Sequence, residues 1–260
     1  MPNSRRFLSR RWLLGLLGGA ALVFSVLMLH PYPRQSLFGP TIRGKPWCVW
    51  EIHVRKQVHG KDERGWYLWV LKTIRALPGD IPDDELWAEL WAAEMLPLWT
   101  HLANDGDDAV RRAAIRDLDR RAEENREVVL PILLSHLNDT DPYCRITSAQ
   151  AVWRVSKDRR AIPAVLSLKG HAEVDLRFAA AMFMHEMPLT EPELFEPLAA
   201  ACEDPSRDVR YYALGVMNQF GKRGIPFLQR ALRDADPPIR ELASRHLHEI
   251  EAKEISEREK

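Results

Sequence analysis

Residues 107–118 read DDAVRRAAIRDL, and the pattern of this stretch returns four more times before the chain ends. Each copy is centred on an arginine, with an apolar residue or a cysteine one position before it. A small residue follows three positions after the arginine, and an apolar residue follows seven after. These offsets fall on one face of an α-helix, so each copy predicts a helix with one buried face. The arginines are Arg111, Arg145, Arg177, Arg210 and Arg240, spaced by 34, 32, 33 and 30 residues.

A second register of residues runs through the same part of the chain. A proline stands 13 or 14 residues before each arginine, within or at the start of an apolar stretch such as PILLSHL. Proline is tolerated in a first helical turn, and turn-forming residues such as Asn138-Asp139-Thr140-Asp141-Pro142 lie between the two stretches. Each unit is therefore predicted to be a pair of helices. The prolines are Pro97, Pro131, Pro163, Pro197 and Pro226.

With its proline in the first helix and Asp…Val-Arg-x-x-Ala at the start of the second, the unit resembles a HEAT repeat. The short bacterial kind, also found in phycobilisome-lyase-type proteins, is the most similar. The resemblance covers residues 95–250 and implies an all-α solenoid. It also implies a structural ladder in which the arginines pair with turn aspartates, and the third copy departs by offering Glu173 or Asp175 instead of an Asp-Pro turn. The implied partners are Asp107, Asp141, Asp208 and Asp236.

Residues 41–94 are less regular and rich in tryptophan. Trp47 and Trp50, like two later pairs (Trp66/Trp69 and Trp87/Trp91), are spaced to share a helix face. A solenoid needs a terminal cap over its open core, so these residues are predicted to form a helical cap; an aromatic ligand cage is the alternative. The sequence GKPxxxW after a hydrophobic segment also resembles HEAT proteins of planctomycete-like bacteria.

The N-terminal segment contains an uncharged run of 18 residues, 12–29. A helix of this length spans roughly 27 Å, close to the ~30 Å hydrocarbon core of a bilayer. Four arginines precede the run, so the positive-inside rule predicts a cytoplasmic N-terminus and a periplasmic body anchored in the inner membrane. A twin-arginine export signal, suggested by Ser9-Arg10-Arg11, is the alternative. Gly15 and Gly19 form a GxxxG pair that could serve as a homodimer contact.

The predicted order of segments follows from these patterns. It comprises a basic cytoplasmic N-terminus (1–11), a transmembrane anchor (12–29), a linker (30–40), a Trp-rich helical cap (41–94), five HEAT-like repeats (95–250) and a charged tail (251–260).

The charge distribution disfavours nucleic acid as a partner. The chain carries 37 basic and 37 acidic residues, and residues 104–260 carry 24 basic against 28 acidic. A DNA-binding array would need a basic stripe to neutralise phosphates, and this one is net acidic. Cys48, Cys144 and Cys202 form no CxxC pair and are predicted to be buried apolar residues rather than metal ligands or disulfides.

No motif of fixed spacing indicates catalysis. HExxH, GxGxxG, GxxxxGK[ST] and GxSxG are missing from the sequence. We therefore expect a protein that is not an enzyme and has no catalytic, cofactor-binding or metal-binding residues.

The middle copies carry apolar side chains where the second helices should face solvent. Positions one, five and eight after the arginine point away from the core, and apolar residues there mark an interaction surface or contacts between repeats. The sequence thus predicts a membrane-anchored scaffold that binds a protein or peptide on its concave face. The alternative is a lyase or chaperone-like enzyme for chromophore attachment, as the phycobilisome-lyase resemblance implies. The predicted partner-binding residues are Ile146, Trp153, Phe178, Met182 and Tyr211.

Overall fold

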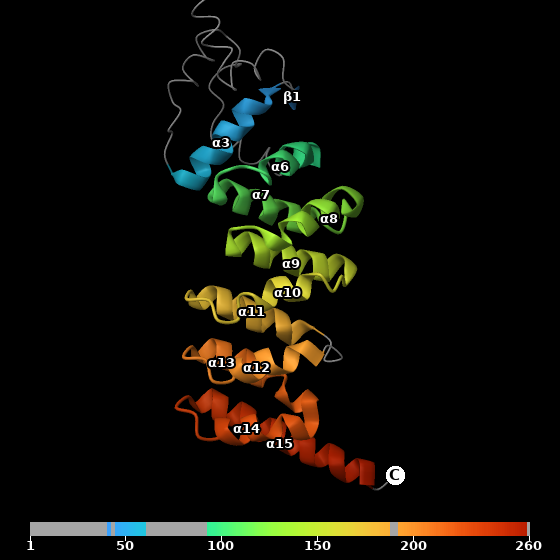
Figure 1. The fold of residues 1–260 in the computed structure, drawn as a ribbon, viewed down its shortest axis with the longest axis vertical. Helices are drawn as coiled ribbons and strands as arrows, with labels where there is room; N and C mark the ends of the chain where they lie inside the picture. Colours follow the sequence, from blue (N-terminus) through green and yellow to red (C-terminus); the bar gives the residue numbers. More distant parts are fainter. Residues whose placement is uncertain (1–40, 43–44, 61–92, 188–191, 259–260) are drawn as a thin grey trace, which may run out of the picture. The chain divides into compact units, whose positions relative to one another are not determined.

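The computed structural model describes residues 41–42, 45–60, 93–187 and 192–258 (Figure 1). The chain divides into two compact units, residues 1–110 and 111–260. The boundary falls within helix α7 (Asp108–Arg121).

The first unit begins with a short β-hairpin, with two residues in each strand, that the sequence did not predict. Strand β1 (Thr41–Ile42) pairs antiparallel with β2 (Lys45–Pro46), and helix α3 (Trp47–His59) follows at once. Trp50 is fully buried and donates its indole N–H to the Ile42 carbonyl at 3.2 Å, which ties the hairpin to the helix. The unit continues with η1 (Ala93–Met95) and α6 (Leu96–Leu102). The later tryptophans of the predicted cap, in 61–92, lie outside the described residues.

The second unit is built of helices that alternate between a first and a second type. The first helices are α8 (Arg126–Ser135), α10 (Ala161–Leu166), α12 (Phe195–Ala201) and α14 (Ile225–Ala231). The second helices are α9 (Pro142–Ser156), α11 (Val174–Glu186), α13 (Arg207–Leu214) and α15 (Pro237–Arg258). Short 3₁₀ segments complete it: η2 (His136–Asn138), η3 (Pro192–Leu194) and η4 (Met217–Arg223). The predicted all-α repeat architecture is confirmed in this coarse form.

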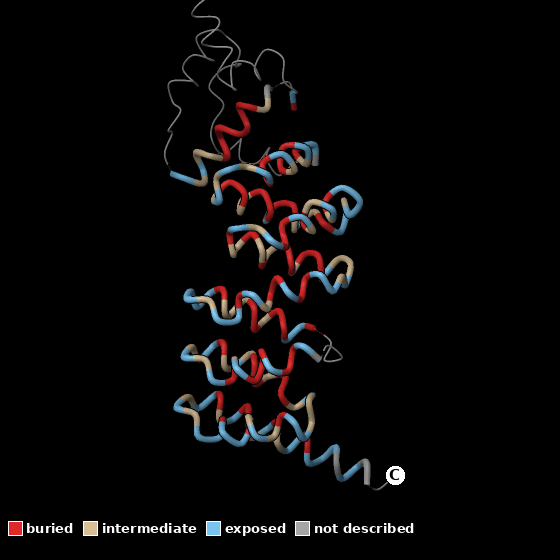
Figure 2. The backbone as a smooth tube through the Cα atoms, in the orientation of Figure 1, coloured by how far each residue is buried: buried red, intermediate tan, exposed pale blue. Residues whose placement is uncertain are grey.

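Each second helix packs against the next, so α9, α11, α13 and α15 form a continuous layer. The residues predicted to face inward are buried along this layer, as the red segments of Figure 2 show. In α9, for example, Cys144, Ser148 and Val152 are fully buried. Leu247 is the exception and is half-buried. A small residue at the centre of each face lets neighbouring helices approach closely.

Two glycines shape the segment between α13 and α14. Gly221 adopts φ +54° and ψ −128°, a conformation that L-residues with side chains rarely take. At Gly224 a Cβ atom would lie 2.0 Å from the Met217 carbonyl oxygen. Only glycine fits at this close approach, and it lets η4 turn sharply into α14.

The predicted location in the inner membrane must be corrected. Across the described residues no helix has both the length and the apolar character needed to cross a membrane. The segment 12–29, on which the prediction of a single-pass protein rested, lies outside the described residues, as do Gly15 and Gly19.

Candidate functional site

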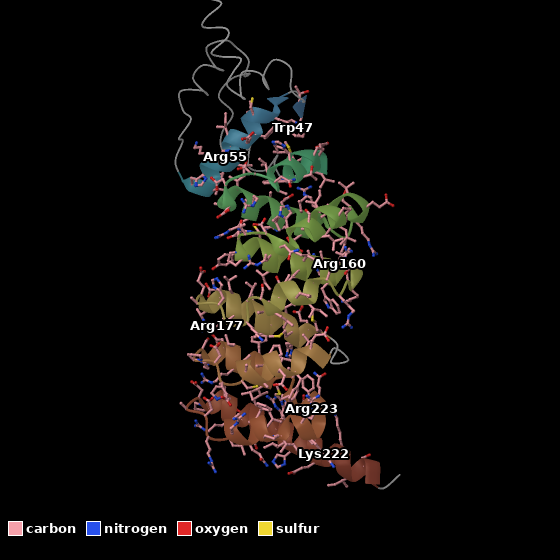
Figure 3. All side chains as sticks on the ribbon, in the orientation of Figure 1. Trp47, Arg55, Arg160, Arg177, Lys222 and Arg223 are labelled. Atoms are coloured by element: carbon pink, nitrogen blue, oxygen red, sulfur yellow. The ribbon has the colours of Figure 1, made fainter. Side chains whose placement is uncertain are left out.

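The most regular polar feature of the second unit is a ladder of arginines at the start of the second helices. Arg177 donates Nε and Nη2 to the two carboxylate oxygens of Asp204, at 2.8 and 3.1 Å. Arg210 makes the same fork to Asp234, at 2.8 and 2.9 Å. Arg111 does so to Asp139, at 3.2 and 2.8 Å. Each fork reaches the turn before the next second helix, so it joins neighbouring repeats. Figure 3 shows Arg177 at the edge of the unit that carries these turns.

The remaining arginine nitrogen, Nη1, binds the arginine's own turn. Arg177 donates to the carbonyls of His171 and Ala172, at 2.8 and 3.0 Å. Arg145, Arg210 and Arg240 bind the corresponding carbonyls of their turns. One guanidinium therefore fixes the turn of its own repeat and, where the fork is complete, the turn of the following one.

The aspartates of the ladder have a second role inside their turns. Each accepts the backbone N–H two residues later, as Asp139 does from Asp141 at 2.8 Å. Burial alone would raise the pKa of Asp139, but hydrogen bonds from Arg111, Asp141 and His136 outweigh it and lower the pKa to about 2. The pKa of Asp204 is lowered by Arg177 against the same burial effect. These groups are carboxylates that the fold holds ionised.

Three of the four predicted ladder partners are wrong. Asp107 and Asp141 instead cap helices: Asp107 accepts the Ala109 N–H at 2.9 Å, and Asp141 accepts that of Cys144 at 2.8 Å. Asp208 is exposed beside Arg207. Of these four aspartates, within the described residues, Asp236 alone accepts a hydrogen bond from a ladder arginine; the donor is Arg210 Nη2, at 2.9 Å. For Asp107 and Asp141 the physical reason is that the residue next to the helix serves as its cap, and the turn residue two positions earlier faces the arginine. Asp208 lies inside α13, beyond the turn.

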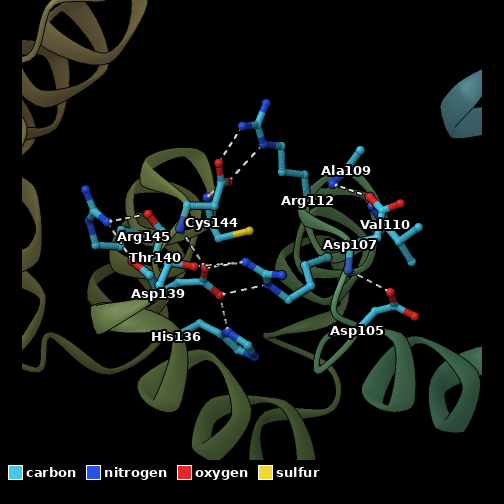
Figure 4. A network of polar contacts seen from close by, with 12 residues as sticks. Asp105, Asp107, Ala109, Val110, Arg112, His136, Asp139, Thr140, Cys144 and Arg145 are labelled. Carbon is cyan, nitrogen blue, oxygen red and sulfur yellow. Dashed lines mark hydrogen bonds and ion pairs between the residues drawn. The ribbon is translucent and has the colours of Figure 1, made fainter.

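A denser network surrounds the first rung (Figure 4). Asp139 lies between the Arg111 guanidinium and the His136 ring, whose Nδ1 is 2.9 Å away. The neighbouring Arg112 forms its own fork to Asp141, with Nε at 2.9 Å, and its guanidinium lies 4.4 Å from the centroid of the Tyr143 ring.

The rung at Arg145 is incomplete. Position 171, which corresponds to the ladder aspartates, is a histidine. Its Nδ1 accepts the Glu173 N–H at 3.1 Å and so repeats the aspartate's role within the turn. Arg145 still binds the carbonyls of Asp139 and Thr140, but its Nε is buried without a hydrogen-bond partner. No carboxylate of the described residues pairs with it.

An aromatic cluster lies on the outer face of α11 and α13. The rings of Phe178 and Tyr212 meet edge-to-face, with centroids 5.2 Å apart. His185 and Tyr211 contact the same Tyr212 ring at 5.8 and 6.1 Å. Tyr211 is 39% exposed, whereas Phe178 and Tyr212 are half-buried. We call these four residues, with the half-buried Met182, the aromatic patch.

The structure separates the predicted partner-binding residues into two groups. Phe178, Met182 and Tyr211 reach the surface in the aromatic patch. Ile146 and Trp153 are 4% and 5% exposed, so the prediction that they face solvent is wrong. Trp153 packs edge-to-face on Phe183 of the next second helix, at 6.4 Å, because α11 stacks on α9 and covers its outer positions. Tyr212, which completes the patch, was missed because its offset predicts neither face clearly.

The cysteines are poorly suited to nucleophilic chemistry. All three are buried, and burial raises the pKa of Cys202 to about 12 and that of Cys144 above its ordinary value. A thiol must ionise to attack, so these residues give no support to the chromophore-attachment alternative. In the part of the chain that the structure describes, no group of three His, Cys, Asp or Glu side chains could hold a metal ion.

Comparison with a family model agrees with the helix pairs. Residues 95–184 match the family model for HEAT repeats, a range that takes in α6 to nearly the end of α11. No curated protein matches the chain. Solved structures do match, among them the crystal structure of an engineered protein from the Northeast Structural Genomics Consortium. That protein is 16% identical, the match covers 60% of this chain and 79% of the other, and the TM-score is 0.48.

Proposed function

We propose that this chain, whose residues 95–184 match HEAT repeats, is a non-catalytic scaffold that binds a protein or peptide partner on its second helices. The observation that carries the proposal is the aromatic patch on α11 and α13. Tyr211 exposes 39% of its surface next to the half-buried Phe178 and Tyr212.

The position of the patch along the repeats supports this reading. At equivalent offsets the outer copies carry charged, exposed residues, namely Arg116 in α7 and Glu241 and Arg245 in α15. The middle copies carry apolar and aromatic side chains at these offsets, although a surface that only faces water needs polar side chains there. Exposed aromatic side chains commonly supply most of the binding energy of an interface, each about 2 kcal/mol or more when central.

The double variant Phe178→Ser/Tyr211→Ser tests the proposal. Tyr211 is exposed and Phe178 is half-buried against Tyr212, so helicity should survive, while capture of the partner by the full chain from a native extract should be lost. Glu241→Ser/Arg245→Ser is the control, because it changes two exposed residues of a second helix, α15, outside the aromatic patch and should leave capture intact.

Circular dichroism and capture are measured on the same samples. A folded patch variant that keeps its partner would overturn the proposal. If the patch variant instead unfolds while the control does not, Phe178 and Tyr211 belong to the packing between repeats and the binding face lies elsewhere.

A further inference from the structure

A second aromatic cluster lies on α12, η4 and α14 and shares no residue with the aromatic patch. The ring of Phe195 meets those of Phe220 and Phe227 edge-to-face, with centroids 5.0 and 5.9 Å apart. Two exposed arginines lie over its rings. The Arg223 guanidinium is 3.8 Å from the Phe195 centroid, and that of Arg230 is 4.8 Å from the Phe227 centroid. A guanidinium held on an aromatic face keeps N–H donors for a further acceptor.

The backbone on both sides of Arg223 has a geometry that only glycine accommodates. Gly221 has a positive φ, and Gly224, the next residue after Arg223, approaches the Met217 carbonyl too closely for a Cβ atom. The Gly224 N–H donates to the Gly221 carbonyl at 2.9 Å, which closes the turn around Arg223. The turn thus places the guanidinium over Phe195 before any ligand arrives, and such preorganisation lowers the entropic cost of binding.

The charge of this region is unlike that of the whole chain. Residues 217–233 contain four basic residues and no acidic one, although the chain as a whole is neutral. Arg230 is paired across the cluster with Glu203 of the preceding repeat, at 2.6 Å. Arg223 is exposed and meets no carboxylate in the part of the chain that the structure describes. Its positive charge is therefore available to an anionic group from outside.

The equivalent arginine of an earlier repeat shows what a neutralised one looks like. Arg160 and Arg223 each stand three residues before the proline of their own helix pair, and Figure 3 labels both. Arg160 is also exposed, but its Nη2 donates to Asp158 of its own turn at 2.7 Å. The turn that carries Arg223 has glycine and lysine where an acid would be needed. The two arginines thus share a position and differ in whether the chain supplies the carboxylate.

The surroundings of Arg223 indicate which kind of anion fits. A guanidinium binds a carboxylate through two parallel hydrogen bonds, and the half-buried rings of Phe220 and Phe227 offer an apolar contact beside it. A nucleic acid would need a continuous basic stripe, whereas α12 exposes Glu196 and Glu203 at this cluster. A short segment with carboxylates next to an apolar side chain matches both features.

We propose that Arg223 and the Phe195, Phe220 and Phe227 rings form a docking surface for an acidic segment of a protein partner. A carboxylate of the segment binds the Arg223 guanidinium, and an apolar side chain packs on the rings. Arg230 borders the surface and contributes less, because Glu203 already neutralises it. This surface goes beyond the scaffold function assigned to α11 and α13, since it gives the array a second contact on its first helices.

The test is an NMR titration of the ¹⁵N-labelled full chain. The probes are the blocked peptide Glu-Asp-Leu-Glu-Asp and its uncharged counterpart Gln-Asn-Leu-Gln-Asn. The amide signals of Gly221 and Gly224 report binding, because these residues flank Arg223. We expect the acidic peptide to shift both signals, and the uncharged peptide to bind at least about tenfold more weakly, because the charge-assisted hydrogen bonds are lost.

Three arginine variants locate the site. Arg223→Gln should weaken binding of the acidic peptide about tenfold, and Arg230→Gln only about twofold. Arg160→Gln is the matched control and should leave the affinity unchanged, because Arg160 is already paired within its turn. Circular dichroism checks that each variant folds. Arg223→Lys, which keeps the charge but not the planar fork, should bind less well than wild type and provides the comparison if Arg223→Gln is unstable.

Several outcomes would overturn the proposal. These are no shift with the acidic peptide, equal binding of the uncharged peptide, or an equal loss of affinity in Arg160→Gln and Arg223→Gln. Tighter binding of a short DNA duplex at the same signals would overturn the assignment to a protein segment. The capture experiment with Phe178 and Tyr211 concerns other helices, so failure of either proposal leaves the other standing.

Discussion

The rungs at Arg177 and at Arg145 begin with the same residue in the same place and end differently. Both arginines bind the carbonyls of their own turn through Nη1. Arg177 goes on to a carboxylate of the next repeat, and Arg145 meets a turn that carries His171 instead. Each arginine therefore makes two separable contributions, one to its own turn and one to the joint between repeats.

The largest expected effect comes from removing the two arginines in turn. Arg177→Ala leaves Asp204 as a buried carboxylate without its cation, which should lower the free energy of unfolding by about 3 kcal/mol. Arg145→Ala removes hydrogen bonds to carbonyls and no ion pair, so about 1 kcal/mol is expected. Urea unfolding followed by circular dichroism measures both. Equal losses would show that the joint between repeats contributes nothing beyond the turn.

A middle-sized effect should depend on pH. Because the pKa of folded Asp139 is about 2 against an ordinary 3.8, its stabilisation is present above pH 3.8 and is lost as pH falls toward 2. Wild type should therefore exceed Asp139→Asn by about 2 kcal/mol near pH 6, and the gap should close toward pH 2. Asp208→Asn, changed at an exposed carboxylate, is the control. A gap independent of pH would contradict the ion-pair explanation.

The smallest expected effect comes from giving the Arg145 rung the carboxylate that the Arg177 rung has. His171→Asp gives Arg145 a partner and should raise the free energy of unfolding by about 1 kcal/mol, since the new pair is only partly buried. His171→Asn should leave it nearly unchanged. The midpoint of urea unfolding again provides the measurement, and a loss of stability in the aspartate variant would mean that the fork cannot form across this turn.

The sequence predicted the helices well and the contacts between them only in part. The arginine and proline registers predicted both types of helix, because an inward-facing stripe and a tolerated proline are local properties of the chain. The ladder was predicted with its arginines but mostly with the wrong aspartates. Asp139 and Asp141 both lie in one turn, and which of them caps the helix depends on backbone geometry that spacing does not reveal. The histidine at position 171 was the available signal of a broken rung.

The partner-binding residues show a second limit. Ile146 and Trp153 occupy the offsets that point away from their own core, and a single helix gives no sign of what covers that face. In the structure α11 covers it, and Trp153 contacts Phe183. The same offsets in α11 and α13 keep Phe178 and Tyr211 at the surface. Exposure in a repeat array is set by neighbouring copies, which the period of one helix cannot predict.

The short sequence separation of the paired residues in each rung affects how the chain folds. Each completed rung joins residues only 28, 27 or 24 positions apart, at Arg111, Arg177 and Arg210 respectively. Such short closures carry a small entropic cost and favour rapid, local folding that spreads from one repeat to the next. We expect this spread to be coupled most weakly between α9 and α11, where no carboxylate of the described residues meets Arg145 across the joint. Under mild denaturant, amide hydrogen exchange should therefore divide the array into two cooperative blocks at this joint.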